Sequence, residues 1–329
     1  MFGLFGCRIN FNIEERGSIV SNTLKMPANI KKKFYKPFRR ENIGLVYILP
    51  WFIGFLVFGL YPFIASIVYS FTDYTLLKPP NFVGIQNYIT MFTTDKDFYK
   101  SLTVTIIYSV VAVPCKLTSA LIIALLMNMK LKAVNLFRTA YYIPSILGGS
   151  VAVAIVWKAL FVNNGVINSI LSTFGIAPVK WLGSPASAIS IIVLLNIWQF
   201  GSSMVIFLAG LKQIPQELYE VARVDGAGKF RIFYKITIPL LTPVIFFNLI
   251  MQLIHSLQEF SAPFLITNGG PMKFTYFYGM KLYEYGFKFY KMGYSCALSW
   301  FLFAIILALT ALIFRSSNSW VYYEDGGKS

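Results

Sequence analysis

The sequence has little of what soluble enzymes use for chemistry. Its 329 residues include three Cys and one His, and only 13% are charged, about half the share in an average soluble domain. Cys7, Cys115 and Cys296 are too few and too scattered for a disulfide framework or a metal cluster. We expect Cys115 and Cys296 to be small core residues. This composition argues against a soluble enzyme and against an intrinsically disordered protein.

Apolar residues, in contrast, are abundant: 57% of the chain is hydrophobic and the mean hydropathy is +0.63. A helix needs about 20 mainly apolar residues to cross a bilayer. The first apolar run starts too far from Met1 and is too long for a cleavable signal peptide. We therefore predict an all-α, multi-pass protein of the cell (inner) membrane. Its six expected spans are 43–71, 102–127, 134–161, 186–211, 238–264 and 293–314.

The net charge of +16 is unevenly distributed along these spans. Segments 1–42, 128–138, 211–239 and 315–329 hold 19 Lys and Arg, whereas 73–100, 158–185 and 262–291 hold 9. Basic residues concentrate on the cytoplasmic side, so both termini are predicted to be cytoplasmic. We expect three regions: a basic N-terminal tail (1–42), a transmembrane domain (43–314) and a C-terminal tail (315–329). The basic tail is short and adjoins a span, which favours contact with anionic membrane lipid over nucleic acid.

The predicted cytoplasmic loop 213–239 is partly amphipathic. Pro215 suits the first turn of a helix, and Glu217 and Glu220 follow where the helix dipole favours acidic residues. An apolar stripe and a Gly-containing turn lead to a second short helix. The stripe and turn residues are Leu218, Val221, Ala222 and Gly226. Such a helix–turn–helix docks into a groove of another protein or lies on lipid, and the residues alone leave both interpretations open.

Three motifs carry a resemblance to a known family. Residues 220–222 (Glu-Val-Ala), Gly226 and 236–239 (Ile-Thr-Ile-Pro) have the spacing of the EAA signature of permease subunits of ATP-binding-cassette (ABC) importers. Val221 and Ile238 replace the family's Ala and Leu. Residues 82–88 (FVGIQNY) and 267–271 (TNGGP) resemble marks of its carbohydrate-importing, maltose-permease branch. The chain is therefore similar to that branch from about residue 43 to 314.

The resemblance implies the type I ABC importer permease architecture and a set of partners. These are a second homologous permease subunit, two cytoplasmic ATPase subunits, an extracytoplasmic sugar-binding protein and an oligosaccharide. It implies no catalytic residue, no metal and no cofactor on this chain, with ATP and Mg on the ATPase subunits. The chain itself lacks a G-x-x-x-x-G-K-[ST] phosphate loop. The residues implied in ATPase coupling are Glu217, Glu220, Ala222, Asp225 and Gly226.

Polar side chains inside the spans indicate a substrate pathway, because such residues are unfavourable in lipid unless they face a cavity or another helix. In the fifth span Gln252, His255, Ser256 and Glu259 have i, i+3, i+4, i+7 spacing, which predicts one helix face. The maltose-permease resemblance adds positions in spans three to five. The predicted pathway residues are Tyr141, Ser145, Asn196, Gln199, Gln252, His255, Ser256 and Glu259. Interhelical hydrogen bonding is the alternative role for all of them.

Charge inside the spans bears on the substrate. Lys116 is expected to face the pathway or to pair with an acidic residue, and the single His255 to be packed or to line the pathway. Lys116, His255 and Lys281 can meet a uronate carboxylate, whereas Glu259 opposes one. We therefore predict import of a di- or oligosaccharide, either neutral or uronate. The alternatives are an ion-coupled secondary transporter, which leaves the EAA motif unexplained, and a membrane enzyme, for which no catalytic motif is found.

Overall fold

The computed structural model describes residues 43–129 and 134–322. The predicted basic tail 1–42 lies outside the described residues, so its role at lipid stays a prediction. The described chain divides into two units, with the boundary between Ile64 and Ala65. We describe each unit by itself.

The first unit contains an apolar helix that continues past the unit boundary. It consists of α2 (Ile43–Phe55), a π-helical turn η2 (Leu56–Leu60) and α3 (Tyr61–Ser70). The π turn ends at Tyr61, whose N–H donates to the Leu56 carbonyl, directly before Pro62. Because Pro62 has no N–H, the helix widens here by one residue. From Tyr47 to Ile64 its large apolar side chains are exposed, as expected for a helix that faces lipid.

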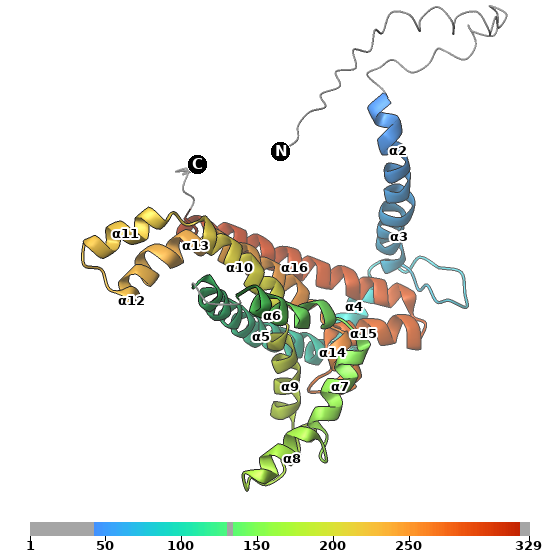
Figure 1. The fold of residues 1–329 in the computed structure, drawn as a ribbon. Helices are drawn as coiled ribbons and strands as arrows, with labels where there is room; N and C mark the ends of the chain where they lie inside the picture. Colours follow the sequence, from blue (N-terminus) through green and yellow to red (C-terminus); the bar gives the residue numbers. More distant parts are fainter. Residues whose placement is uncertain (1–42, 130–133, 323–329) are drawn as a thin grey trace, which may run out of the picture. The chain divides into compact units, whose positions relative to one another are not determined.

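The second unit is a helical bundle (Figure 1). Its helices are α4 (Gln86–Thr93), α5 (Lys96–Asn128), α6 (Val134–Leu147), α7 (Val151–Phe161), α8 (Val166–Thr173), α9 (Pro185–Trp198), α10 (Gly201–Gln213), α11 (Gln216–Val224), α12 (Lys229–Ile232), α13 (Ile238–Leu257), α14 (Ser261–Ile266), α15 (Tyr278–Tyr283) and α16 (Met292–Trp320). Two further π turns, η3 (Phe233–Thr237) and η4 (Glu284–Lys288), precede α13 and follow α15.

The membrane-spanning helices agree with an all-α, multi-pass architecture. Within residues 43–129 and 134–322, five helices are long and apolar enough to cross a bilayer. A sixth span results if α9 and α10, which are bent by 43° relative to each other, count as one. The predicted fold class is thereby confirmed. The side on which each terminus lies stays a prediction.

Two details of the sequence prediction are wrong. The third span was expected as one helix over 134–161, but residues 148–150 interrupt it and separate α6 from α7. The candidate span in this region is instead Val151–Thr173. Cys115 is exposed on α5 rather than part of the core, because the lipid-facing side of a membrane helix is as apolar as its packed side.

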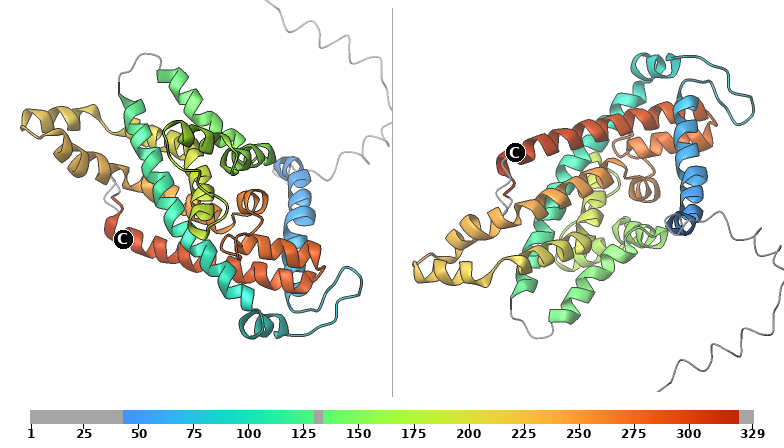
Figure 2. Two further views of the ribbon diagram at one scale, coloured as in Figure 1. Left: turned by 90° about the horizontal axis from the view of Figure 1, so that it is seen from below. Right: turned by 90° about the horizontal axis from the view of Figure 1, so that it is seen from above.

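Helix α5 is the centre of the second unit. It packs against α9, α10, α13 and α15, and the two views of Figure 2 show it crossing the bundle between them. One hydrophobic core joins α5 to α10 and α13 through buried side chains. They include Leu117, Ala120, Ala124, Met204, Phe207 and Leu241. Side chains from helices far apart in sequence are therefore fixed relative to α5.

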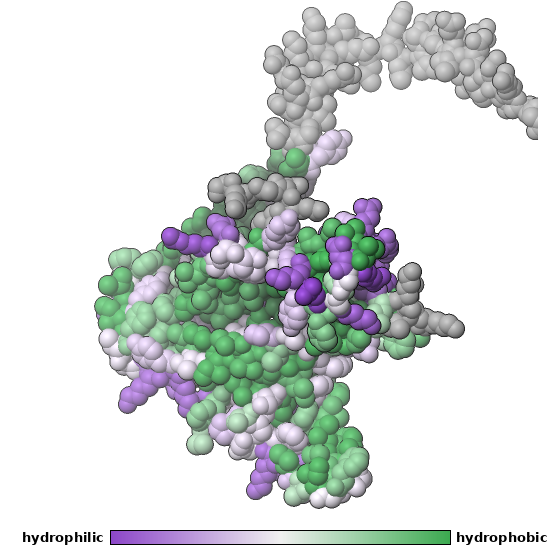
Figure 3. All heavy atoms as spheres, turned by 90° about the vertical axis from the view of Figure 1, so that its left-hand side faces the viewer, coloured by the Kyte–Doolittle hydropathy of each residue, from purple (hydrophilic) through white to green (hydrophobic). Residues whose placement is uncertain are grey.

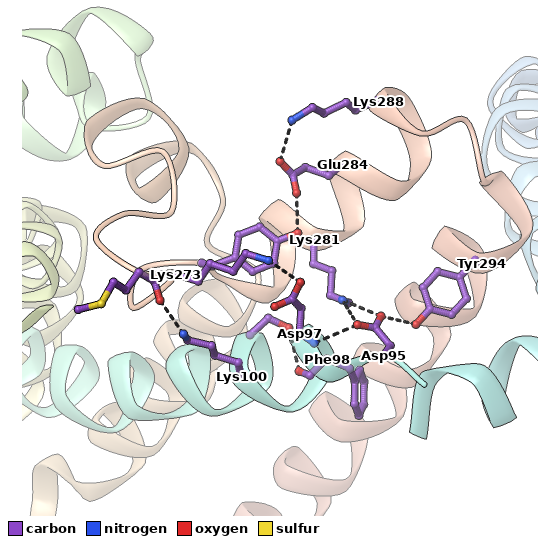
Figure 4. Close-up of polar contacts among 12 residues, drawn as sticks. Asp95, Asp97, Phe98, Lys100, Lys273, Lys281, Glu284, Lys288 and Tyr294 are labelled. Atoms are coloured by element: carbon purple, nitrogen blue, oxygen red, sulfur yellow. Dashed lines mark hydrogen bonds and ion pairs between the residues drawn. The ribbon is translucent and has the colours of Figure 1, made fainter. Parts of the chain in front are cut away.

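A buried ion pair connects the start of α5 to α15 and α16 (Figure 4). The Lys281 Nζ lies 2.7 Å from the Asp95 carboxylate, and the Lys281 side chain has no exposed surface. The Tyr294 hydroxyl donates to the same carboxylate at 2.6 Å. The Asp95 carboxylate also accepts the N–H of Asp97 and so caps α5. We call Asp95, Lys281 and Tyr294 the Asp95 cluster.

The charges of Asp95 and Lys281 compensate each other within the Asp95 cluster. Burial raises the pKa of the Asp95 carboxyl, but hydrogen bonds from Lys281 and Tyr294 lower it by more and hold this pKa below its usual range. Asp95 is therefore ionised at neutral pH and compensates the buried ammonium of Lys281. A neighbouring ion pair, Asp97 with Lys273, is largely exposed. Exposed ion pairs contribute little to the free energy of unfolding.

We expect Asp95→Asn to destabilise the protein strongly, because it leaves the Lys281 ammonium buried without a counter-ion. Breaking a buried pair costs about 3–5 kcal/mol. Thermal unfolding of the purified, detergent-solubilised protein measures the effect. Asp97→Asn is the matched control and is expected to change the free energy of unfolding by less than about 1 kcal/mol. Equal losses in the two variants would contradict the structural role of the buried pair.

Candidate functional site: a cavity at three helix breaks

Three helix pairs of the second unit are interrupted. The breaks lie at residues 148–150 between α6 and α7, at 199–200 between α9 and α10, and at 258–260 between α13 and α14. In the hydrocarbon region a helix break exposes backbone N–H and C=O groups that water does not reach. Such breaks persist only where protein groups or a water-filled cavity satisfy the backbone. All three breaks therefore call for polar partners.

Side chains from two of the breaks satisfy each other's backbone. The Ser145 hydroxyl donates to the Gln199 carbonyl at 3.0 Å and accepts the Ser202 N–H at 3.0 Å. In return, the Gln199 side-chain amide donates to the Gly148 carbonyl at 3.1 Å. The close approach of these segments also requires Gly201, where a Cβ atom would collide with the Tyr141 carbonyl oxygen. Ser145 and Gln199 thus hold α6 against the junction of α9 and α10.

The third break is stabilised by Glu259. Its carboxylate accepts the Ala262 N–H at 3.2 Å, which caps the start of α14. Helix α13 ends at Leu257, so Glu259 lies beyond it. The sequence prediction that Gln252, His255, Ser256 and Glu259 share one helix face is correspondingly wrong for Glu259. A carboxylate that caps a new helix lies in a loop rather than on the preceding helical stripe.

A polar cavity of about 490 Å³ lies where the three breaks meet. This volume falls in the range of about 300–1,000 Å³ that is typical of small-molecule sites. Hydroxyl, amide and charged groups line it together with the rings of Tyr108 and Phe260. Six predicted pathway residues are in its wall: Ser145, Asn196, Gln199, Gln252, His255 and Glu259. Lys116 of α5 is also part of the wall.

Two predicted pathway residues lie outside this lining. The Ser256 side chain is buried, and its hydroxyl donates to the Leu253 carbonyl of the same helix at 2.9 Å. Tyr141 packs its ring against Phe200, with 5.9 Å between the ring centroids. Interhelical hydrogen bonding, the alternative role, also occurs: the Gln252 amide donates to the Ser203 hydroxyl at 3.0 Å. Gln252 thus serves packing and cavity wall together.

Sequence reasoning missed part of the cavity wall. The missed residues are Tyr108, Gly148, Gly149, Ser150, Ala154, Ile192, Leu195, Ser202, Gln258, Phe260, Ser261 and Ala262. Most of them belong to the breaks or flank them. The Gly148-Gly149-Ser150 triplet inside an expected span was the available signal, because Gly and Ser weaken a helix. Tyr108 carried no comparable signal, since an aromatic residue in a span is ordinary.

The hairpin of α11 and α12 is the second candidate site. It projects from one end of the bundle, whereas α4 and α15 lie at the other end (Figure 1). Gly226 ends α11 with φ +76°, the left-handed conformation of a Schellman motif. The Ala227 N–H donates to the Ala222 carbonyl at 2.9 Å, as that motif requires. The predicted helix–turn–helix is therefore present, with Pro215 just before the first helical residue.

The hairpin exposes both charged and apolar side chains. Glu217, Glu220 and Asp225 are exposed, and Ala222 is half-buried. Val224 is 87% exposed and Phe230 84% exposed. Figure 3 views the molecule from this end and shows hydrophilic side chains gathered beside hydrophobic ones. Exposed apolar groups on a short, polar-edged hairpin are typical of an interaction surface.

The hairpin is inserted between two walls of the cavity. Helix α10, which carries Ser202, leads into α11, and η3 leads from α12 into α13, which carries Gln252 and His255. The Tyr219 hydroxyl lies 3.2 Å from that of Thr237 and joins α11 to η3. At the end of η3 the Ile238 N–H donates to the Phe233 carbonyl, directly before Pro239. The hairpin is therefore joined to both α10 and α13.

Comparisons with known proteins identify the family. Residues 96–322 match the family described as binding-protein-dependent transport system inner membrane component. The chain belongs to this family. The probable ABC transporter permease protein YesP of Bacillus subtilis (strain 168) is 44% identical over 87% of this chain and 94% of its own. The trehalose/maltose transport system permease protein MalF of Thermococcus litoralis is 35% identical over 75% and 83%.

A solved structure confirms the fold. The crystal structure of a bacterial alginate ABC transporter, in complex with alginate pentasaccharide-bound periplasmic protein, contains a chain that is 24% identical. It covers 84% of this chain and 94% of its own at a TM-score of 0.74. The family predicted from the EAA, FVGIQNY and TNGGP motifs is confirmed, as is the multi-pass location in the cell membrane.

The breaks generate a prediction about packing. We expect Gly201→Ala to destabilise the protein by about 1–3 kcal/mol, because the added methyl group meets backbone atoms of α6 that have no room to move. Gly149→Ala is the matched control: it lies at another break, and a Cβ there meets nothing within 4 Å. Thermal unfolding in detergent compares the two. A loss at Gly149 as large as that at Gly201 would contradict the packing argument.

Proposed function

We propose that this chain is the transmembrane permease subunit of an ATP-driven importer of a di- or oligosaccharide, and that it forms half of the translocation pathway. The observation that carries the proposal is the hairpin inserted between α10 and α13, two walls of a polar cavity. An importer requires such a link between an energy-coupling surface and a substrate path. Rigid-body movement then opens the cavity to alternate sides.

The cavity supports a carbohydrate as the substrate. Sugar hydroxyls both donate and accept hydrogen bonds, and amide and hydroxyl side chains such as Asn196 and Ser145 do the same. The rings of Tyr108 and Phe260 offer apolar faces for the C–H faces of a sugar. MalF, named for trehalose and maltose transport, is among the relatives. Membership of a binding-protein-dependent family disfavours the ion-coupled alternative.

The remaining partners follow from the same proposal. A second, homologous permease subunit completes the pathway, and an extracytoplasmic binding protein delivers the sugar. Two ATPase subunits hold ATP and Mg, and the hairpin of this chain docks into a groove of an ATPase subunit on the cytoplasmic side. Glu217, Glu220, Ala222, Asp225 and Gly226 are the proposed coupling residues. The exposed side chains of Val224 and Phe230 offer apolar surface that can pack in the groove of the ATPase subunit.

Docking is tested at Val221, which is 61% exposed on α11. We expect Val221→Asp to reduce co-purification of the ATPase subunits at least roughly tenfold, because an unpaired carboxylate is disfavoured in an apolar groove. Quantitative blotting of the affinity-purified complex measures it. Gln213→Asp adds the same charge at the exposed end of α10, outside α11, and is expected to leave co-purification unchanged. Retention of the ATPase by Val221→Asp would argue against docking on the hairpin.

The pathway is tested at Asn196 in the cavity wall. Asn196→Leu keeps the size of the side chain but removes its amide, and we expect uptake to fall roughly tenfold, the value of one or two hydrogen bonds. Uptake into proteoliposomes is measured with two probes, a pool of neutral oligosaccharides and a pool of uronate oligosaccharides. Ser256→Ala, outside the lining, is the control expected to retain uptake. Unchanged uptake by Asn196→Leu would place the pathway elsewhere.

A further inference from the structure

Lys116 is a buried cation that faces the cavity. It lies on α5, only 7% of its surface is exposed, and it forms part of the cavity wall. Within the described chain, the ion pairs found are those of Lys273, Lys281 and Lys288 and do not include Lys116. No hydrogen bond of its ammonium is found there either. The three N–H donors of Lys116 therefore make no hydrogen bond within the described chain, although the residue lines the cavity.

Glu259 does not supply the missing acceptor for the Lys116 ammonium. Its carboxylate lines the same cavity and acts electrostatically on Lys116. The two groups form no ion pair, however, and the Glu259 carboxylate instead accepts the Ala262 N–H. The cavity therefore contains a positive and a negative group that face a shared space without direct contact. The donors of Lys116 thus remain free for a ligand.

Lys281 is the other buried lysine to compare with Lys116, because its ammonium does have an ion-pair partner. Lys281 is also buried, but its ammonium contacts the Asp95 carboxylate at 2.7 Å and its side chain has no exposed surface. Lys281 is therefore a structural cation, and the sequence-based idea that it meets a uronate is wrong. Polar groups kept inside a membrane protein without a structural partner are typically functional. Lys116 fits that description and Lys281 does not.

We propose that Lys116 is a substrate-binding and specificity-determining residue, whose ammonium donates hydrogen bonds to oxygen acceptors of the glycan in the cavity. Glu259 lies across the same space and accepts from an adjacent hydroxyl. The ligand this pair recognises has an oxygen acceptor next to a hydroxyl donor, the arrangement found on every sugar ring. A ring or hydroxyl oxygen of a neutral sugar and a uronate carboxylate both supply the acceptor. The inference rests on the proposed import function and adds the residue whose ammonium determines which glycan binds.

The test uses the assembled transporter with its ATPase subunits and binding protein, reconstituted in proteoliposomes. Lys116→Met keeps the length of the side chain but removes its charge and its donors. We expect KM for uptake to rise at least roughly tenfold with the pool, neutral or uronate, that the wild-type complex imports. The pool for which KM rises shows whether Lys116 donates to an oxygen of a neutral sugar or to a uronate carboxylate. Cys115→Met places the same side chain on the exposed side of α5 and is expected to retain the wild-type KM.

A double variant separates substrate binding from charge balance. If Lys116 served only to compensate Glu259, Lys116→Met/Glu259→Gln would restore uptake, and that result would overturn the inference. A substrate-binding role predicts that the double variant remains at least as impaired as Lys116→Met. Unchanged KM in Lys116→Met would also overturn it. Absence of uptake of both pools by the wild-type complex would instead contradict the proposed function, and this inference would fall with it.

Discussion

The requirement that every backbone N–H and C=O inside a membrane finds a partner is the constraint on which this structure depends. Three helix pairs are broken at one level of the bundle, and each break leaves polar groups without helical partners. Ser145 and Gln199 satisfy two of the breaks reciprocally, and Glu259 caps the third. The place where helices cannot continue is for that reason the place where polar side chains and a cavity collect.

The same reasoning separates the two buried lysines. Lys281 is neutralised by Asp95, with Tyr294 as a further donor, and this cluster ties α5 to α15 and α16. Lys116 is buried on the central helix α5 but faces the cavity, where Glu259 acts on it electrostatically without forming an ion pair. Lys281, whose partners all belong to the protein, holds helices together. Lys116 has no such partner in the described chain and remains available to a ligand.

Hydropathy predicted most of the fold because a span is a local property of about 20 residues. It failed at residues 148–150, where a break is stabilised by Gln199 from another helix. The helical spacing that placed Glu259 with Gln252 and His255 failed for the same kind of reason, since Glu259 caps α14. Six pathway residues predicted by motif and polarity do line one cavity. Tyr108 and the Lys281–Asp95 pair needed tertiary contacts that a sequence does not display.

The way the breaks are closed bears on how an importer of this kind moves. Continuous helices resist bending because each turn is held by several backbone hydrogen bonds, whereas two of the junctions here are joined by side-chain contacts of Ser145 and Gln199. The hairpin is joined to α10 on one side and, through η3, to α13 on the other. Force applied at the hairpin is therefore expected to change the cavity at its junctions rather than to deform the helices, as in a two-state rigid-body switch.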